Sequence, residues 1–177
     1  MQDLKQNYFE LFKLPVSYDV DIASLTEKYR DMQVAAHPDR VAAESEEVKM
    51  RAVQFSSFIN EAYDSLKDPL KRLAYILSLN GLDVEKVSQS DLGMDLLMEQ
   101  MQLRESLEEL PKDESAIEDL ESIKKDVQEK QKQRLDDISA SLGEQDFESA
   151  KKLYHEMQFL YKLLAEIEAG EEARLGY

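Results

Sequence analysis

Apolar residues in the first half of the chain recur at helical spacing. A short amphipathic segment, 8–14, is stopped by Pro15. A second helix is expected to begin at an Asp21 cap and to end near Ala36, because a residue that precedes a proline is pushed out of the α region. One face of this helix is apolar at steps of three and four residues. Its members are Ile22, Leu25, Tyr29 and Met32.

Two more helices follow a polar stretch, 40–47. Asp68-Pro69 separates them, because Asp caps a helix and Pro suits its first position. The second of the two is expected to end at Asn80-Gly81. The first carries a continuous apolar stripe made of Val48, Ala52, Phe55, Ile59, Ala62 and Leu66, and the second carries Leu70, Leu73, Ala74 and Leu77.

The residue pattern of the second half predicts three longer helices, at 91–110, at 113–142 and from an Asp146 cap to about 170. Pro111 is expected to end the first of them and Gly143 the second. Two short turns favour antiparallel neighbours and hence a three-helix bundle. The chain is therefore predicted to be all-α, with a first domain at 1–79, a connector at 80–90 and a bundle at 91–177. The expected core face of the last helix is Ala150, Leu153, Met157, Leu160, Leu164 and Ile167.

The helix at 91–110 has two apolar faces. At about 100° per residue, Leu103, Leu107 and Leu110 share the direction of Leu96, and this face is expected to join the core. The opposite side holds Met94, Leu97, Met98 and Met101, flanked by Arg104 and Glu105. Phe159 points away from the core face of its own helix. An exposed Leu/Met patch favours a protein-binding surface, although packing on the first domain or dimerisation would also use it.

The amino-acid composition argues against several classes of partner and site. Hydrophobic residues make up 42% of the 177 residues, too many for a disordered tail. The net charge of −16 argues against nucleic acid and anionic lipid as partners. The absence of cysteine and the presence of only two histidines predict neither a cofactor nor a metal site. No 18-residue apolar stretch and no leader-like N-terminus occur, so a cytoplasmic protein without a membrane span is expected.

His37-Pro38-Asp39 is the one specific motif, and it lies between two amphipathic helices. No nucleophile or acid–base pair accompanies it, so no catalytic residue is assigned and an enzyme is not expected. From 8 to about 76 the chain resembles a J domain. That resemblance implies binding to ATPase chaperones of the seventy-kilodalton heat-shock class and stimulation of their ATP hydrolysis. The residues implied for chaperone contact are His37, Pro38, Asp39, Lys28, Tyr29, Arg30 and Arg40.

The chain departs from the common J-domain pattern at two places. Ala36 stands where an aromatic residue is usual, and Glu27 and Asp31 dilute a helix that is usually strongly basic. These differences favour a dedicated chaperone partner over a general-purpose one.

Three tracts, 72–77, 95–105 and 159–163, extend the resemblance over essentially the whole chain, and the Leu-Met-Glu-Gln tract is similar to that of HscB-type co-chaperones of iron–sulfur cluster assembly. The resemblance implies that the bundle binds an IscU-type scaffold and that the J domain docks on an HscA-type ATPase chaperone. Without cysteine, the chain resembles the bacterial form. The residues implied for scaffold contact are Leu97, Met98, Met101, Arg104, Glu105 and Phe159; Gln102 stands where an acidic residue is common.

The expected function is thus that of a monomeric co-chaperone that delivers the scaffold to the chaperone and activates the chaperone's ATPase. Two alternatives stay open at this point. One is a J-domain co-chaperone with a different client, and the other is a non-enzymatic, acidic helical interaction protein whose His-Pro-Asp sequence is incidental.

Overall fold

The computed structural model describes residues 6–84 and 93–176, and within these ranges it contains helices and no strands. The predicted all-α class is confirmed. The chain divides into two compact units, Met1–Leu79 and Asn80–Tyr177. Part of the expected connector, 85–90, and the expected start of the next helix at 91 lie outside the described residues.

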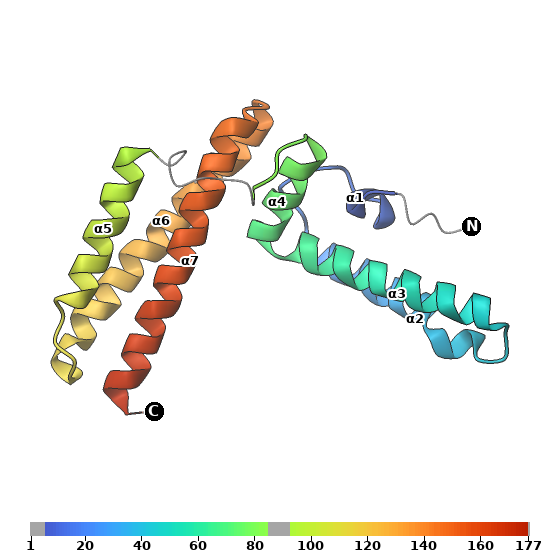
Figure 1. Cartoon of the computed structure of the whole chain (residues 1–177), viewed down its shortest axis with the longest axis horizontal. Coiled ribbons are helices and arrows are strands. Elements are labelled where there is room, and N and C mark those ends of the chain that lie inside the picture. Colours follow the sequence, from blue (N-terminus) through green and yellow to red (C-terminus); the bar gives the residue numbers. More distant parts are fainter. Residues whose placement is uncertain (1–5, 85–92, 177) are drawn as a thin grey trace. The chain divides into compact units, whose positions relative to one another are not determined.

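The first unit is an antiparallel helical hairpin flanked by two shorter helices (Figure 1). Its core is made of large side chains from all four α-helices. Phe9, Leu25, Ile59, Leu66, Leu73 and Leu77 are fully buried. The helices are α1 (Tyr8–Leu11), α2 (Ile22–Ala36), the 3-10 helix η1 (Pro38–Val41), α3 (Glu46–Lys67) and α4 (Pro69–Leu79).

Local side-chain chemistry sets the helix starts of this unit. Asp21 accepts hydrogen bonds from the backbone N–H groups of the first turn of α2, and Ser45 accepts one from the N–H of Val48 in α3. Each satisfies donors that have no partner inside the helix. At the other end, α2 stops at Ala36 as Pro38 predicts.

The hairpin is less buried at each of its two ends than the periodicity predicts. Val48 and Ile22 were expected on the apolar stripes, but both are exposed. Each lies in the first turn of its helix, where the partner helix covers less of the surface. The stripe of α3 becomes buried only from Phe55 onward.

Arg72 is a buried charged residue in the core of this unit. Its Nη1 donates to the carbonyl oxygen of Leu66 (2.6 Å), and its guanidinium carbon lies 5.0 Å from the ring centroid of Tyr18. The charge is thus compensated by a carbonyl dipole and an aromatic face, as a buried cation requires. This arrangement ties α4 to the end of α3 and to the loop before α2.

The second unit is a three-helix bundle in which α6 and α7 run antiparallel along their length (Figure 1). The buried residues of the bundle helices come from these two helices and from η3, and they include Leu120, Val127, Ile138, Met157, Leu160, Leu163 and Ile167. The helices are α5 (Met94–Glu108), the 3-10 helix η3 (Glu114–Ala116), α6 (Ile117–Gly143) and α7 (Phe147–Leu175).

Two details of the bundle differ from the expectation. Gly143 was expected to follow the last residue of α6, but it is itself the last helical residue. The left-handed conformation in the turn is taken by Gln145 instead, with φ 59°. In α7, Leu163 is buried in place of Leu164, and Leu153 is half-buried. In a straight α-helix, two residues seven positions apart differ in direction by about 20°. In a helix as long as α7, the positions that face the partner helix therefore change gradually along the helix.

Candidate functional site

The His-Pro-Asp turn lies at the tip of the α2–α3 hairpin. His37 leaves the helical conformation (φ −59°, ψ 128°) because Pro38 follows it, and Pro38 then starts η1. The backbone N–H of Asp39 donates to Nδ1 of His37 (3.3 Å). This local bond orders the turn while leaving the side chain of Asp39 90% exposed and that of His37 59% exposed. The turn therefore presents the carboxylate of Asp39 to solvent on a backbone that a local hydrogen bond holds in place.

Three basic side chains were expected beside the turn, and they occupy different environments. Arg40 is exposed and donates to the carbonyl oxygen of Val34 (3.3 Å), which fastens η1 to the last turn of α2. Arg30 is exposed on α2. Lys28 is half-buried, and its ammonium lies 3.4 Å from the carbonyl oxygen of Lys13, on the loop that follows α1. Arg30 and Arg40 are thus the more accessible cations of this group.

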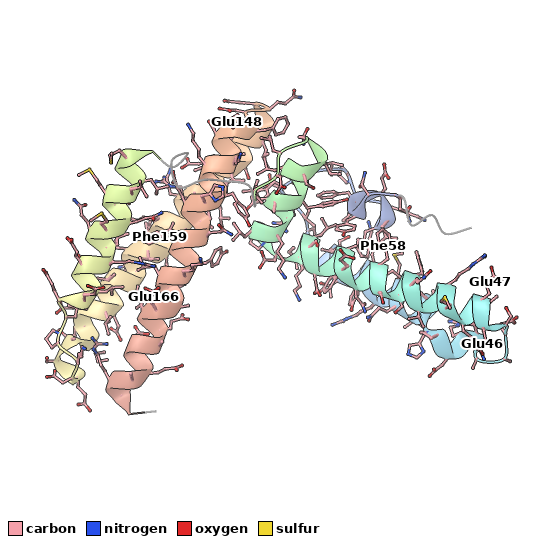
Figure 2. All side chains as sticks on the ribbon, in the orientation of Figure 1. Glu46, Glu47, Phe58, Glu148, Phe159 and Glu166 are labelled. Carbon is pink, nitrogen blue, oxygen red and sulfur yellow. The ribbon has the colours of Figure 1, made fainter. Side chains whose placement is uncertain are left out.

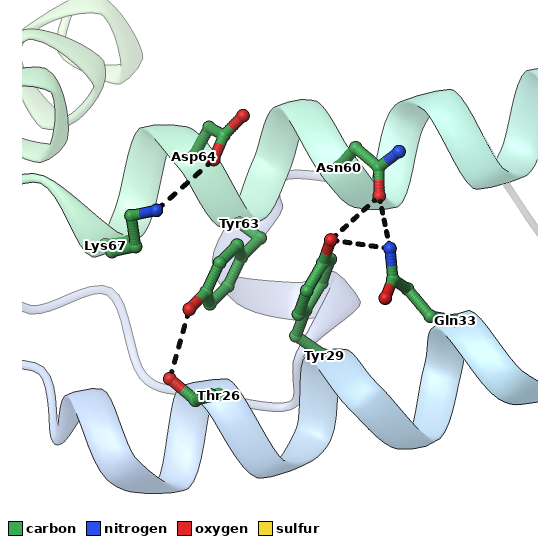
Figure 3. A network of polar contacts seen from close by, with 7 residues as sticks. All are labelled: Thr26, Tyr29, Gln33, Asn60, Tyr63, Asp64 and Lys67. Carbon is green, nitrogen blue, oxygen red and sulfur yellow. Dashed lines mark hydrogen bonds and ion pairs between the residues drawn. The ribbon is translucent and has the colours of Figure 1, made fainter.

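Tyr29 takes part in the packing of α2 on α3 (Figure 3). Its ring stacks on that of Tyr63, with centroids 3.9 Å apart and planes 9° apart. Its hydroxyl donates to Oδ1 of Asn60 (3.2 Å) and accepts from the amide of Gln33 (2.5 Å), which also donates to Asn60 (2.9 Å). This residue, expected at the chaperone contact, lies half-buried in the seam between the helices.

The second group of expected residues lies on α5 and α7. Met94, Met98 and Met101 are 73%, 53% and 63% exposed, and Leu97 is half-buried beside them. These four residues are called the α5 apolar face below. The predicted inner side, with Leu96 and Leu103, is only half-buried. The helix therefore exposes the face that the periodicity places outward.

Phe159 is half-buried on α7 near α5 (Figure 2). It lines a small cavity together with Leu96 of α5 and Leu160 of α7. The guanidinium carbon of Arg104 lies 5.9 Å from its ring centroid, and Nη2 of the same arginine lies 3.5 Å from Oε1 of Glu166. Arg104 thus joins α5 to α7 over the Phe159 ring, while Glu105 is exposed.

Several contacting residues were missed by reading the sequence. Asn60 and Gln33 complete the hydrogen bonds of Tyr29, and Glu99 of α5 pairs with Lys130 of α6. The four-residue spacing of Tyr29 and Gln33 places both on one helix face. Cross-helix partners such as Lys130 have no such signal, because their meeting depends on how the helices pack.

The described residues were searched for a metal-ligand cluster and for a membrane-spanning helix. Within 6–84 and 93–176, no three His, Cys, Asp or Glu side chains are placed to hold a metal ion. No helix in the same ranges is long and apolar enough to cross a membrane. Of the features expected from the sequence to bind partners, the exposed turn and the α5 apolar face are both accessible.

Comparisons with known proteins match nearly the whole chain. The family described as "HSCB C-terminal oligomerisation domain" matches residues 92–168. The "Co-chaperone protein HscB homolog" of Shewanella amazonensis is 37% identical over 172 residues, covering 96% of this chain and 99% of that protein.

Solved structures agree with the sequence relatives. The chaperone HscB from Vibrio cholerae superposes with a TM-score of 0.85 at 35% identity, covering 94% of this chain and 98% of that one. The human co-chaperone protein HscB gives a TM-score of 0.87 at 30% identity, covering 95% of this chain and 83% of that one. The likeness thus includes both units.

Proposed function

The chain belongs to the HscB family of co-chaperones, and from this membership we propose that it binds an IscU-type iron–sulfur scaffold and delivers it to an HscA-type ATPase chaperone. The expected resemblance and the J-domain-plus-bundle fold are confirmed by the same relatives. In the proposal, the J domain stimulates ATP hydrolysis by the chaperone, and the protein performs no bond chemistry of its own.

The observation that carries the proposal is the ordered, exposed His-Pro-Asp turn. The local bond to His37 holds the backbone of Asp39, so less backbone entropy is lost when its carboxylate binds. It can form a charge-assisted hydrogen bond with a cationic group of the chaperone. Arg30 and Arg40 add positive charge to the same hairpin and would complement an acidic groove.

Scaffold binding is proposed for the α5 apolar face together with Phe159. Flexible, polarisable methionines adapt to a partner surface, and a partly covered aromatic ring provides an anchor. The proposed contacts are Leu97, Met98, Met101, Arg104, Glu105 and Phe159. Arg104 has a second role as well, because it already bridges Phe159 and Glu166.

The proposed mechanism is that of an adaptor with two binding ends. One covalent chain holds the scaffold and the chaperone together, so the second binding event takes place at a raised effective concentration. Two interfaces of moderate strength can then form a ternary complex. Tightening of the chaperone on the scaffold would favour cluster transfer.

ATPase measurements on a purified HscA-type chaperone test the function. We expect the protein alone to raise the steady-state rate, and the protein plus scaffold to raise it further. A general-purpose chaperone of the same class serves as the control and should respond less. Absence of stimulation at saturating co-chaperone, with or without scaffold, would contradict the proposal. Stimulation without any effect or binding of the scaffold would indicate a different client.

Self-association is a second candidate use of the α5 apolar face. The matching family carries the description of an oligomerisation domain, and exposed methionines could meet those of a second copy. Sedimentation equilibrium distinguishes the two uses. A monomer at micromolar concentration supports scaffold binding alone, whereas a dimer that the scaffold dissociates would show that both share the surface.

A further inference from the structure

The attachment of α5 to the bundle differs from that of the other two helices. None of the described side chains of α5 is buried, although α6 and α7 bury a continuous core. A small cavity remains under α5, lined by Leu96, Lys130 and Phe159 among others. Half-buried leucines hold a helix against its neighbours but resist rotation about its axis weakly, because apolar contact has no direction.

Among the described side chains, two ion pairs cross from α5 to the other helices of the bundle. Glu99 forms an ion pair with Lys130 of α6, and the two side chains are 34% and 41% exposed. Arg104 pairs with Glu166 of α7 at 3.5 Å. At about 100° per residue, Glu99 lies about 60° to one side of Leu96 and Arg104 about 80° to the other. The pairs therefore flank the inward-facing stripe and reach different helices.

We propose that these two ion pairs fix the rotational setting of α5, which makes Glu99 and Lys130 positioning residues for the binding of the scaffold. A pair on each side of the stripe opposes rotation in both directions. The setting keeps the α5 apolar face outward and holds Phe159 next to it through Arg104. Neither Glu99 nor Lys130 is among the residues proposed to contact the scaffold. The inference rests on the proposed function.

Charge reversal with rescue tests the pairing. Lys130→Glu should weaken binding of a purified IscU-type scaffold about fivefold, because it replaces a half-exposed attraction by a repulsion. The double variant Glu99→Lys/Lys130→Glu restores the pair in the opposite sense and should recover the affinity. Lys132→Glu is the matched control. It changes the net charge equally on the same helix, and Lys132 is exposed with no ion pair among the described residues.

A spectroscopic readout separates positioning from direct contact. The chain has no cysteine, so nitroxide labels can be attached uniquely at Ser106→Cys in α5 and Lys162→Cys in α7, both exposed positions. We expect the distance distribution between the labels to broaden or shift with Lys130→Glu. It should stay unchanged with Lys132→Glu and return in the double variant.

The outcomes distinguish this inference from the proposed function. If Lys130→Glu binds the scaffold as Lys132→Glu does, or if its affinity falls while the distance distribution stays unchanged, the positioning role is overturned. Failure of the double variant to recover would overturn it too. The label distances need no partner. A wild-type protein that binds no scaffold would therefore overturn the function, while the distances still decide whether the pairs set the position of α5.

Discussion

The carboxylate of Asp39 is the residue on which chaperone stimulation is proposed to depend most. It is almost fully exposed, so its removal leaves no buried group without a partner. Asp39→Asn is expected to abolish stimulation of the chaperone's ATPase while leaving the circular dichroism spectrum and the scaffold affinity unchanged. Asp31→Asn removes an exposed carboxylate from α2 and is the control. Equal stimulation by both variants would contradict the assignment of the turn.

Tyr8 gives a pH-dependent prediction at the same scale. Its hydroxyl donates to Glu61 (2.9 Å), and burial together with this carboxylate raises the pKa of Tyr8 from 10.0 to about 12. The unfolded chain thus releases the phenolic proton at lower pH than the folded one. The stabilisation is complete below the unfolded pKa and is lost as the pH rises from 10 toward 12.

Tyrosine absorbance during alkaline titration measures this effect. Tyr8→Phe should remove one late-titrating phenol and reduce the loss of stability above pH 10. Glu61→Gln is the companion variant, because it keeps a hydrogen-bond acceptor but removes the charge that raises the pKa of Tyr8. Its late transition should move to lower pH. A late transition that stays complete in Tyr8→Phe, or that does not move in Glu61→Gln, would contradict the proposed cause.

At the scale of an element, α5 carries two unequal apolar sides. Neither side is fully buried, so the periodicity alone does not decide which one binds a partner. The outward side is proposed for the scaffold because its methionines are the exposed large apolar side chains of the helix.

Paired methionine substitutions test the α5 apolar face. Met101 and Met50 are 63% and 62% exposed, and the second lies on α3 of the other unit. Met101→Ala should weaken scaffold binding by about 1–2 kcal/mol, whereas Met50→Ala should leave it unchanged. Calorimetric titration measures both. Adding Leu97→Ala and Phe159→Ala to Met101→Ala should bring the loss to several kcal/mol. Native affinity in the triple variant would contradict the proposed surface.

At the scale of the whole molecule, charge is unevenly distributed between the two units. Residues 1–75 hold 10 basic and 13 acidic side chains, net −3, whereas 76–177 hold 12 and 25, net −13. The acidic second half repels further copies of itself and keeps an exposed apolar face soluble. The nearly balanced first half allows the few cations of the hairpin to act locally.

The adaptor mechanism predicts that a variant that still binds the scaffold but cannot activate the chaperone inhibits the wild-type protein. Asp39→Asn is expected to bind the scaffold without presenting it productively. In an ATPase assay with limiting scaffold, an excess of Asp39→Asn over the wild type should therefore lower the scaffold-dependent stimulation. Combining Asp39→Asn with the triple alanine substitution should remove the inhibition, because that protein no longer holds the scaffold. Inhibition by both variants would indicate competition at the chaperone.

The sequence by itself determined the helix boundaries that depend on local chemistry. Pro38 ends α2 at Ala36, and the caps Asp21 and Asp146 begin α2 and α7 as predicted. It also separated the apolar residues of α5 into two opposite sides, because side-chain direction follows from the helical period. These features need only neighbours within a few residues, so an amino-acid pattern contains them.

The tertiary structure alone decided the contacts between helices. It buries Leu163 in place of Leu164, leaves Val48 exposed, and places Tyr29 between Asn60 and Tyr63. It also brings Glu99 to Lys130, two residues 31 positions apart. Such pairings depend on the crossing and register of packed helices, which result from the combined burial of many side chains. No local pattern of residues contains that information.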